Sequence, residues 1–143
     1  MFLSILNNEE KEDFLNLIIN VAEVDGDFSE KEKNQIGAYV LEMGLNLKVK
    51  AEYNKSNELL LDTLSKSTNE VKKAIFVEVV ALMLVDGMKE EEQALLSQMQ
   101  NKFEFDDSFK EEAINWYSEM LPLYKKGFEL VGIGGALWVG LVL

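Results

Sequence analysis

The length, composition and charge of the chain already narrow its fold and its chemistry. It has 143 residues, 48% of them hydrophobic, which is enough for one domain to bury a core without disulfide or metal crosslinks. Because the chain has no cysteine and no histidine, it cannot form disulfides, thiolate or histidine metal sites, or a Ser–His or Cys–His catalytic pair. A formal net charge of −12 disfavours nucleic acid and favours hard cations or basic protein surfaces as partners, unless the charge serves only solubility.

The first predicted helix is apolar on most of its sides, as expected for a helix at the centre of a core. It begins near Asn7 or Asn8, either of which can cap the free backbone amides, and it continues to about Val24. Gly26 ends it, because glycine readily takes the left-handed conformation that closes a helix.

The next part of the chain is predicted to form two further helices. Ser29 and Glu32 have the spacing of a capping box, in which each side chain satisfies the backbone amide of the other residue. The helix that they begin ends at Gly44. Residues 46–56 show no clear periodicity, whereas residues 58–64 are rich in leucine and predict a short helix.

A second long apolar segment follows in residues 74–85. Ser67 and Glu70 repeat the capping-box spacing in front of it. Val79 and Val80 are β-branched, so a buried strand is the competing interpretation, but the length of the segment and its cap favour a helix.

Two more helices complete the predicted domain. Three consecutive glutamates, residues 90–92, begin one helix, and Asp106 or Asp107 caps the other. Pro122, the single proline of the chain, bends or ends this last helix. Three large side chains at helical spacing on it are expected in the core: Trp116, Tyr117 and Met120.

The strongest pattern in the sequence is an internal repeat. A helix, an Asp-Gly dipeptide and a second helix occur in residues 14–43 and again in residues 74–103. One such unit cannot bury its apolar helix alone. We therefore expect an all-α fold, a compact helical bundle of two pseudo-symmetric helix–Asp-Gly–helix repeats. The apolar stripes of the two second helices correspond as well, with Ile36, Tyr39 and Met43 matching Leu96, Met99 and Phe103.

Residues 24–32 read Val-Asp-Gly-Asp-Phe-Ser-Glu-Lys-Glu, and this segment resembles the recurring motif of the TerB-like family, named for a tellurite-resistance protein. Residues 85–92 resemble a shorter version, with Met88 where an acidic residue would be expected. The similarity covers about residues 9–105. It implies a helical domain of two pseudo-symmetric halves, here residues 1–126, with an acidic surface and a role in stress response and membrane-associated complexes.

The resemblance also implies a bound divalent cation, calcium or magnesium. A hard cation needs several converging oxygens at about 2.3–2.6 Å. Some of the same side chains have a purely structural interpretation, because Ser29 and Glu32 can cap a helix. The loop is not an EF-hand, since Ile36 occupies the twelfth position counted from Asp25. The candidate ligands are Asp25, Asp27 and Glu32 in the first copy and Asp86 and Glu92 in the second.

Residues 127–143 form a separate, glycine-rich apolar tail. From Leu130 to Leu143 its 14 residues carry no charge, whereas a full membrane span needs roughly 20 apolar residues. The glycines suit close helix packing in lipid, and Lys125 and Lys126 lie on the flank expected to remain cytoplasmic. The tail is therefore either a membrane anchor or a segment that docks on the domain and covers an apolar groove.

These observations favour a non-catalytic TerB-like protein-interaction module over an enzyme. We expect it to act in stress response at the cytoplasmic membrane face, with a protein partner and a divalent cation; the sequence leaves a homo-oligomer open. The N-terminus lacks a basic segment followed by a long apolar one, so no signal peptide is expected.

The alternatives are a small-molecule or lipid-binding helical protein and, less favoured, a carboxylate- and metal-dependent enzyme. Consecutive glutamates such as residues 90–92 fan around a helix and do not converge on one reacting atom.

Overall fold

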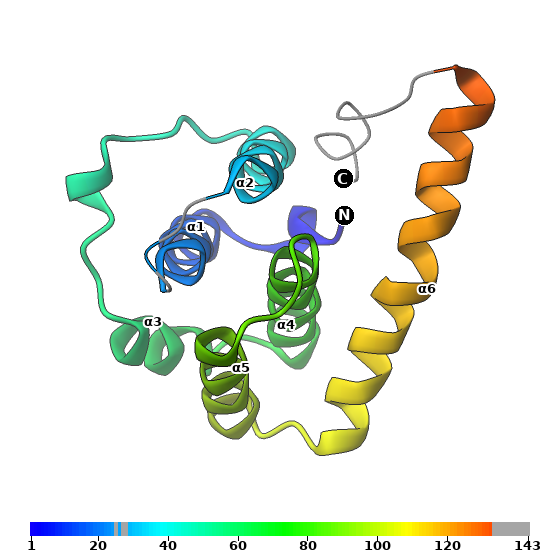
Figure 1. Cartoon of the computed structure of the whole chain (residues 1–143). Helices are drawn as coiled ribbons and strands as arrows, with labels where there is room; N and C mark the ends of the chain where they lie inside the picture. Colours follow the sequence, from blue (N-terminus) through cyan, green and yellow to red (C-terminus); the bar gives the residue numbers. More distant parts are fainter. Residues whose placement is uncertain (25, 27–28, 133–143) are drawn as a thin grey trace.

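The structure is a computed structural model that describes residues 1–24, 26 and 29–132 (Figure 1). Over this part of the chain every regular element is helical and no strand occurs, so the predicted all-α fold class is confirmed. The described residues form two short 3-10 helices and six α-helices: η1 (Leu3–Ile5), α1 (Asn8–Glu23), α2 (Glu30–Met43), η2 (Lys50–Glu52), α3 (Asn57–Leu64), α4 (Asn69–Leu84), α5 (Glu90–Phe103) and α6 (Asp107–Val131).

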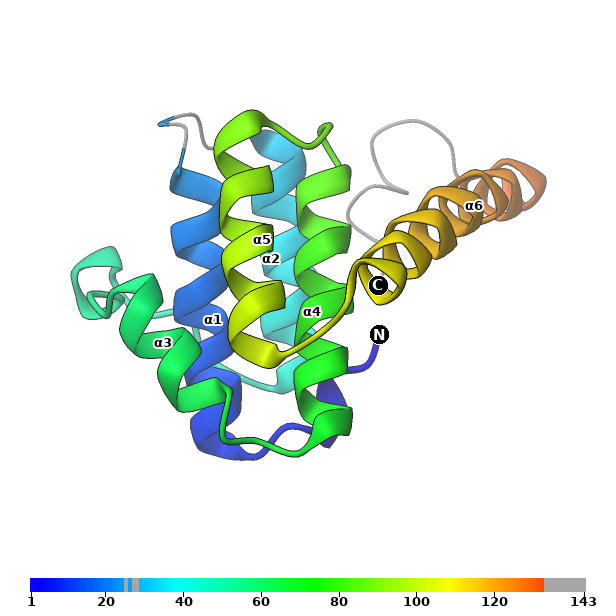
Figure 2. The ribbon, with the colours of Figure 1, turned by 90° about the horizontal axis from the view of Figure 1, so that it is seen from below.

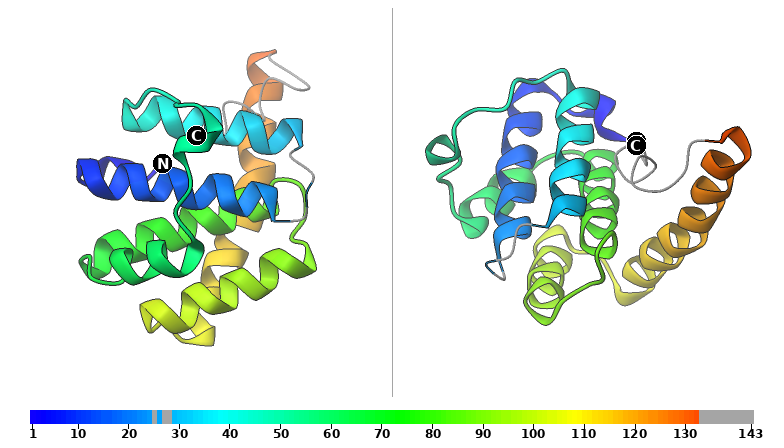
Figure 3. Two further views of the ribbon diagram at one scale, coloured as in Figure 1. Left: turned by 90° about the vertical axis from the view of Figure 1, so that its left-hand side faces the viewer. Right: turned by 45° about the horizontal axis from the view of Figure 1, so that its top comes forward.

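Four of the helices run side by side. The axes of α1, α2, α4 and α5 are roughly parallel, and α3 crosses the outer side of α1 and α5 (Figure 2). Helix α6 packs against α4 and then projects away from the bundle at a steep angle (Figures 1 and 2). The segment between α2 and α3 arches outward on the other side of the molecule, away from α6 (Figure 3).

The core is built mainly from α1 and α4. Both helices are apolar nearly all round, and they pack against each other at the centre of the bundle (Figure 3). Burial of each large apolar side chain in such a position contributes roughly 1.5–3 kcal/mol. The fully buried side chains include Phe14, Leu17 and Ile18 of α1 and Ile75, Phe76 and Val79 of α4.

The N-terminus of α4 differs from its prediction by one residue. Thr68, and not Ser67, caps the helix by accepting a hydrogen bond from the backbone amide of Val71. The hydroxyl of Ser67 instead donates a 2.5 Å hydrogen bond to a carboxylate oxygen of Glu10 in α1. A contact between distant parts of the chain therefore uses the side chain that local spacing assigned to the cap. At α2, by contrast, the predicted capping box of Ser29 and Glu32 is present.

The prediction that Pro122 could end the last helix is wrong, because α6 continues to Val131. Proline removes one backbone donor and leaves the carbonyl oxygen of Ser118, four residues earlier, without its helical partner. Since Ser118 and Pro122 are both exposed, water can bind that oxygen. Of the side chains expected in the core, Tyr117 is buried, whereas Trp116 is 39% exposed.

The corresponding helices of the two predicted repeats have equal lengths. Helices α1 and α4 both contain 16 residues, and α2 and α5 both contain 14. Gly26 and Gly87 follow the first helix of each pair with φ angles of 78° and 82°. The second helix of each pair ends at a residue of left-handed conformation, Gly44 after α2 and Glu104 after α5.

Candidate functional site

The residues predicted to bind a cation lie in different surroundings. Asp25 and Asp27 fall outside the described residues. Glu32 and Glu92 are buried in the first turns of α2 and α5, and Asp86 is exposed just after α4. We call the two Asp-Gly segments, residues 25–32 and 86–92, the first and second corners. Each corner has one buried glutamate among its described carboxylates, and the second corner also has an exposed aspartate.

Glu32 and Glu92 have the same structural role. A carboxylate oxygen of Glu32 accepts the backbone amide of Ser29 at 3.2 Å, and one of Glu92 accepts that of Lys89 at 3.0 Å. Within the described ranges, no group of three or more acidic side chains could hold a metal ion together. Cation binding at the first corner depends on the two aspartates outside those ranges, and it stays a prediction.

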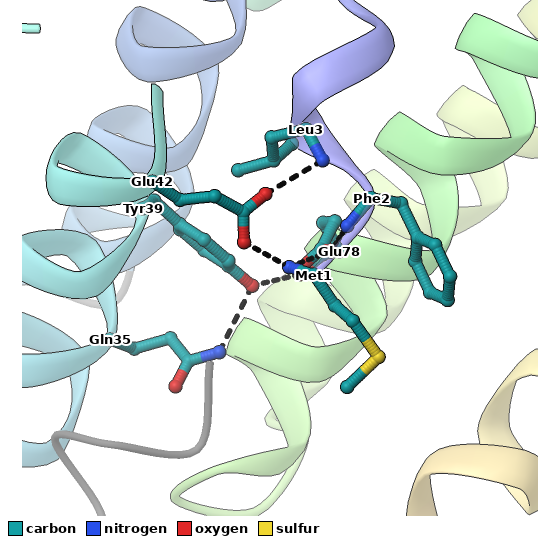
Figure 4. A network of polar contacts seen from close by, with 7 residues as sticks. All are labelled: Met1, Phe2, Leu3, Gln35, Tyr39, Glu42 and Glu78. Carbon is teal, nitrogen blue, oxygen red and sulfur yellow. Dashed lines mark hydrogen bonds and ion pairs between the residues drawn. The ribbon is translucent and has the colours of Figure 1, made fainter. Parts of the chain in front are cut away.

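Two glutamates that the sequence patterns did not indicate hold the N-terminal segment (Figure 4). The amino group of Met1 forms ion pairs with Glu42 of α2 and with Glu78 of α4, the latter at 2.8 Å. The backbone amide of Phe2 donates to the carboxylate of Glu78 at 2.8 Å, and that of Leu3 donates to the carboxylate of Glu42 at 2.7 Å. The short helix η1 is thereby fixed between α2 and α4. We call these contacts the N-terminal network.

Glu78 is the buried member of this network, with 1% of its surface exposed. A carboxylate in such a place is strongly destabilising unless it is paired and hydrogen-bonded. The N-terminal segment supplies both kinds of contact. A lone glutamate inside the otherwise apolar segment of residues 74–85 was the available sequence signal. Its partners could not be read from the same pattern, because they lie on another helix and at the start of the chain.

Tyr39 and Gln35 extend the network along α2 (Figure 4). The hydroxyl of Tyr39 donates to the backbone carbonyl of Glu78 at 2.6 Å and accepts from the side-chain amide of Gln35 at 3.1 Å. Burial, and then the nearby charge of Glu78, raise the pKa of Tyr39 well above its ordinary value of 10.0. The hydroxyl therefore stays protonated at neutral pH, which suits a structural anchor better than proton transfer.

The N-terminal segment also contacts α6. The ring of Phe2 lies 5.8 Å from the ring of Trp116. The next residue, Tyr117, is buried against Ala81 of α4. The first half of α6 is thus attached both to α4 and to the segment that the N-terminal network fixes.

The second half of α6 carries an apolar row that continues the buried one. Its members recur every three or four residues and therefore lie on one face of the helix. Leu123 and Val131 are 69% and 74% exposed. The row, which we call the α6 row, lines a hollow of about 720 Å³ and consists of Met120, Leu123, Tyr124, Gly127, Phe128 and Val131.

The α6 row belongs to an amphipathic helix that crosses the predicted boundary between residues 126 and 127 without interruption. Lys125 and Lys126 lie on its polar side, because their positions fall between those of the row. The helix ends at Val131, followed by Gly132 in the left-handed conformation. None of the helices in the described part of the chain combines the length and the hydropathy that crossing a membrane requires.

No family model, curated protein or solved structure matches this chain. The resemblance to the TerB-like family therefore rests on the motif in residues 24–32 and its shorter copy in residues 85–92. Membership of that family stays a prediction. The α6 row is the structural feature from which we infer a function.

Proposed function

We propose that the protein is a non-catalytic, TerB-like interaction module that attaches to the cytoplasmic face of a membrane. The attachment would be made by the α6 row together with the uncharged residues that follow it. The observation that carries this proposal is the continuation of the apolar face of α6, from Met120 to Val131, beyond its contact with α4.

The form of α6 supports a helix that lies in the membrane surface. Residues 120–131 extend roughly 18 Å at 1.5 Å per residue, too short to span a bilayer but long enough to lie in its interface. Such interfacial helices have one apolar face and basic residues on the other. Exposed Leu123 and Val131 stand on the first face, and Lys125 and Lys126 stand on the second.

Charge and sequence continuity favour a membrane over other occupants of this surface. The chain carries a net charge of −12, but residues 120–132 contain two lysines and a single glutamate. This end of the molecule is therefore locally positive, and anionic headgroups do not repel it as they repel the molecule as a whole. The chain continues directly from it into residues 133–143, which include no charged side chain.

The remaining parts of the proposal extend the family resemblance. We infer that the two halves of the bundle are pseudo-symmetric repeats, supported by the equal lengths of their helices and the left-handed glycines between them. The acidic surface would bind a basic protein partner and, at the first corner, a divalent cation. A role in stress response belongs to the same inference.

Vesicle flotation tests the membrane attachment. The full chain is mixed with phosphatidylglycerol–phosphatidylethanolamine vesicles and is expected to float with them. The double variant Leu123→Glu/Val131→Glu is expected to remain at the bottom of the gradient, because it places two charges on the apolar face. Leu41→Glu/Leu59→Glu is the matched control, since it adds the same charges at exposed leucines elsewhere and should float. A full chain that stays at the bottom would reject the proposal.

Truncation after Gly132 then separates the two predicted roles of the tail. If residues 133–143 serve as an anchor, the truncated protein keeps its urea midpoint and floats less. If they dock on the domain instead, the midpoint falls, because apolar surface is uncovered. A lowered midpoint with unchanged flotation would contradict the anchor.

A further inference from the structure

A second apolar hollow is formed by α1, α2 and the segment that follows them. These elements lie on the side of the bundle away from α6 (Figures 1 and 3). Its volume of about 680 Å³ is within the range of roughly 300–1,000 Å³ that small-molecule sites occupy. Helices α1 and α2 form two of its walls, and the segment that leads from α2 to α3 forms the third. We call it the α1–α2 hollow. The apolar side chains that line it are Ile19, Ile36, Leu47 and Tyr53.

Hydrogen bonds hold the third wall in place. The hydroxyl of Tyr53 accepts the backbone amide of Lys48 at 2.9 Å, which closes the segment on itself. Farther along, Lys55 binds α1 twice, through its ammonium to Asp13 at 2.8 Å and through its backbone amide to Asn16 at 3.2 Å. The hollow is therefore formed before any occupant arrives, as is usual for ligand sites.

Gly37 exposes helix backbone along the α2 wall. A glycine in the middle of a helix weakens it relative to alanine, so it needs a reason. Packing does not supply one, because a Cβ atom at Gly37 would meet no described atom within 4 Å. The close approach of a ligand to the backbone is a second recognised use of glycine.

The charged groups at the hollow favour an anionic ligand. Lys33 and Lys48 both line it, together with Glu23, in a chain whose net charge is −12. Lys33 pairs with Glu30 at 3.1 Å and Lys48 with Glu12 at 3.5 Å, and all four of these side chains are substantially exposed. Exposed pairs of this kind contribute little stability, so neither pair fixes its ammonium group strongly.

We propose that the α1–α2 hollow binds a free single-chain carboxylate amphiphile of the fatty-acid class. The alkyl chain lies along Ile19, Ile36 and the backbone of Gly37, and the carboxylate faces Lys33 and Lys48. This inference does not depend on the proposed membrane attachment.

Calorimetric titration of the full chain with decanoate, below its micelle concentration, tests this site. We expect saturable binding of one molecule, and Gly37→Leu should weaken it by at least about tenfold, because the added side chain fills the hollow. Gly127→Leu is the matched control. Gly127 is also a mid-helix glycine, and a Cβ atom added to it would meet no described atom within 4 Å. It differs in lying on the α6 row. Circular dichroism confirms that both variants fold.

Decan-1-ol tests the role of the lysines, because it has the same chain without the charge. The variant Lys33→Gln/Lys48→Gln should weaken decanoate by about tenfold and leave decan-1-ol unchanged. The proposal is overturned if decanoate shows no saturable binding. It is also overturned if Gly127→Leu weakens decanoate binding and Gly37→Leu does not, because the amphiphile would then lie on α6. Equal effects of the lysine variant on both ligands would overturn the assignment of a carboxylate.

Discussion

The hydroxyl of Tyr39 donates a 2.6 Å hydrogen bond to the backbone carbonyl oxygen of Glu78 and so joins the middle of α2 to the middle of α4. Both groups are buried. Tyr39→Phe should lower the free energy of unfolding by about 1–3 kcal/mol, because it removes this bond and also leaves the side-chain amide of Gln35 without its acceptor. Urea denaturation measures the loss. Tyr124→Phe, at a partly buried position on α6, is the control, and an equal loss there would contradict the prediction.

Alkaline pH should destabilise the fold through its buried tyrosines. Burial, reinforced by the charge of Glu78, raises the pKa of Tyr39 well above 10.0 and that of Tyr117 to about 12. A raised pKa in the folded state means that the unfolded chain binds fewer protons above pH 10. The free energy of unfolding is therefore unaffected by these tyrosines below pH 10. It falls as the pH rises from 10 toward 12, by up to about 1.4 kcal/mol per pH unit for each tyrosine.

Urea midpoints measured between pH 8 and about 11.5 check this dependence. Tyr117→Phe should flatten the decline above pH 10 and have no effect on the slope below it. The hydroxyl of Tyr117 has no hydrogen-bond partner in the described structure, so its removal should cost little stability at pH 8. A decline that is equally steep in this variant would refute the assignment to Tyr117.

Removing the charge of Glu78 should loosen the N-terminal segment. Glu78→Gln keeps an oxygen that can accept the amide of Phe2 but loses the ion pair with the amino group of Met1. We expect a loss of about 1–3 kcal/mol in unfolding free energy. Glu70→Gln, at an exposed position on α4, should change little. Because Phe2 lies against the ring of Trp116, tryptophan fluorescence should also shift in the Glu78 variant and not in the control.

The ends of α2 and α5 offer a reciprocal test of backbone strain. Glu104 follows α5 with a φ of 61°, the only positive φ outside glycine among the described residues, and Gly44 follows α2 with a φ of 67°. A side chain costs about 1 kcal/mol in this conformation. Glu104→Gly should therefore raise the unfolding free energy by about that amount, and Gly44→Ala should lower it similarly. A lower stability of Glu104→Gly would mean that the glutamate side chain offsets the strain.

The cation prediction can be decided by calorimetry with calcium, magnesium and manganese. The resemblance to the TerB-like family predicts binding heat that Asp25→Ala abolishes. Glu32→Gln separates ligation from capping, because glutamine still offers an oxygen to the amide of Ser29 but has no charge. We expect this variant to fold with normal stability and to bind the cation more weakly. If no heat is measured, or if Asp25→Ala leaves it unchanged, the cation site is removed from the proposal.

Features that depend on neighbours in sequence were predictable. Ser29 and Glu32 cap α2 three residues apart, and Gly44 ends that helix, because caps and left-handed ends are made by adjacent residues. The length of the apolar segment in residues 74–85 distinguished a helix from a strand. The helical class of the fold followed from the same periodicity.

Features that depend on contacts between distant residues were not predictable in this way. Ser67 has the right spacing for a cap, but a carboxylate on α1 binds its hydroxyl, and Thr68 takes the role. Pro122 lies where its lost hydrogen bond is exposed to water, so the helix passes through it. Glu42 and Glu78 of the N-terminal network are 36 residues apart in the sequence, and the packing of α2 against α4 brings them together.

The sequence by itself therefore determined that the fold is helical, where most of the helices begin, and that the molecule is acidic and lacks thiol and imidazole chemistry. Only the tertiary structure decided that α6 leaves the bundle with its apolar row exposed, and that α1, α2 and the segment after them enclose a hollow. The physical reason is one of range. Caps and periodicity act within a few residues, whereas the direction of a helix and the shape of a cavity are set by the packing of side chains from the whole chain.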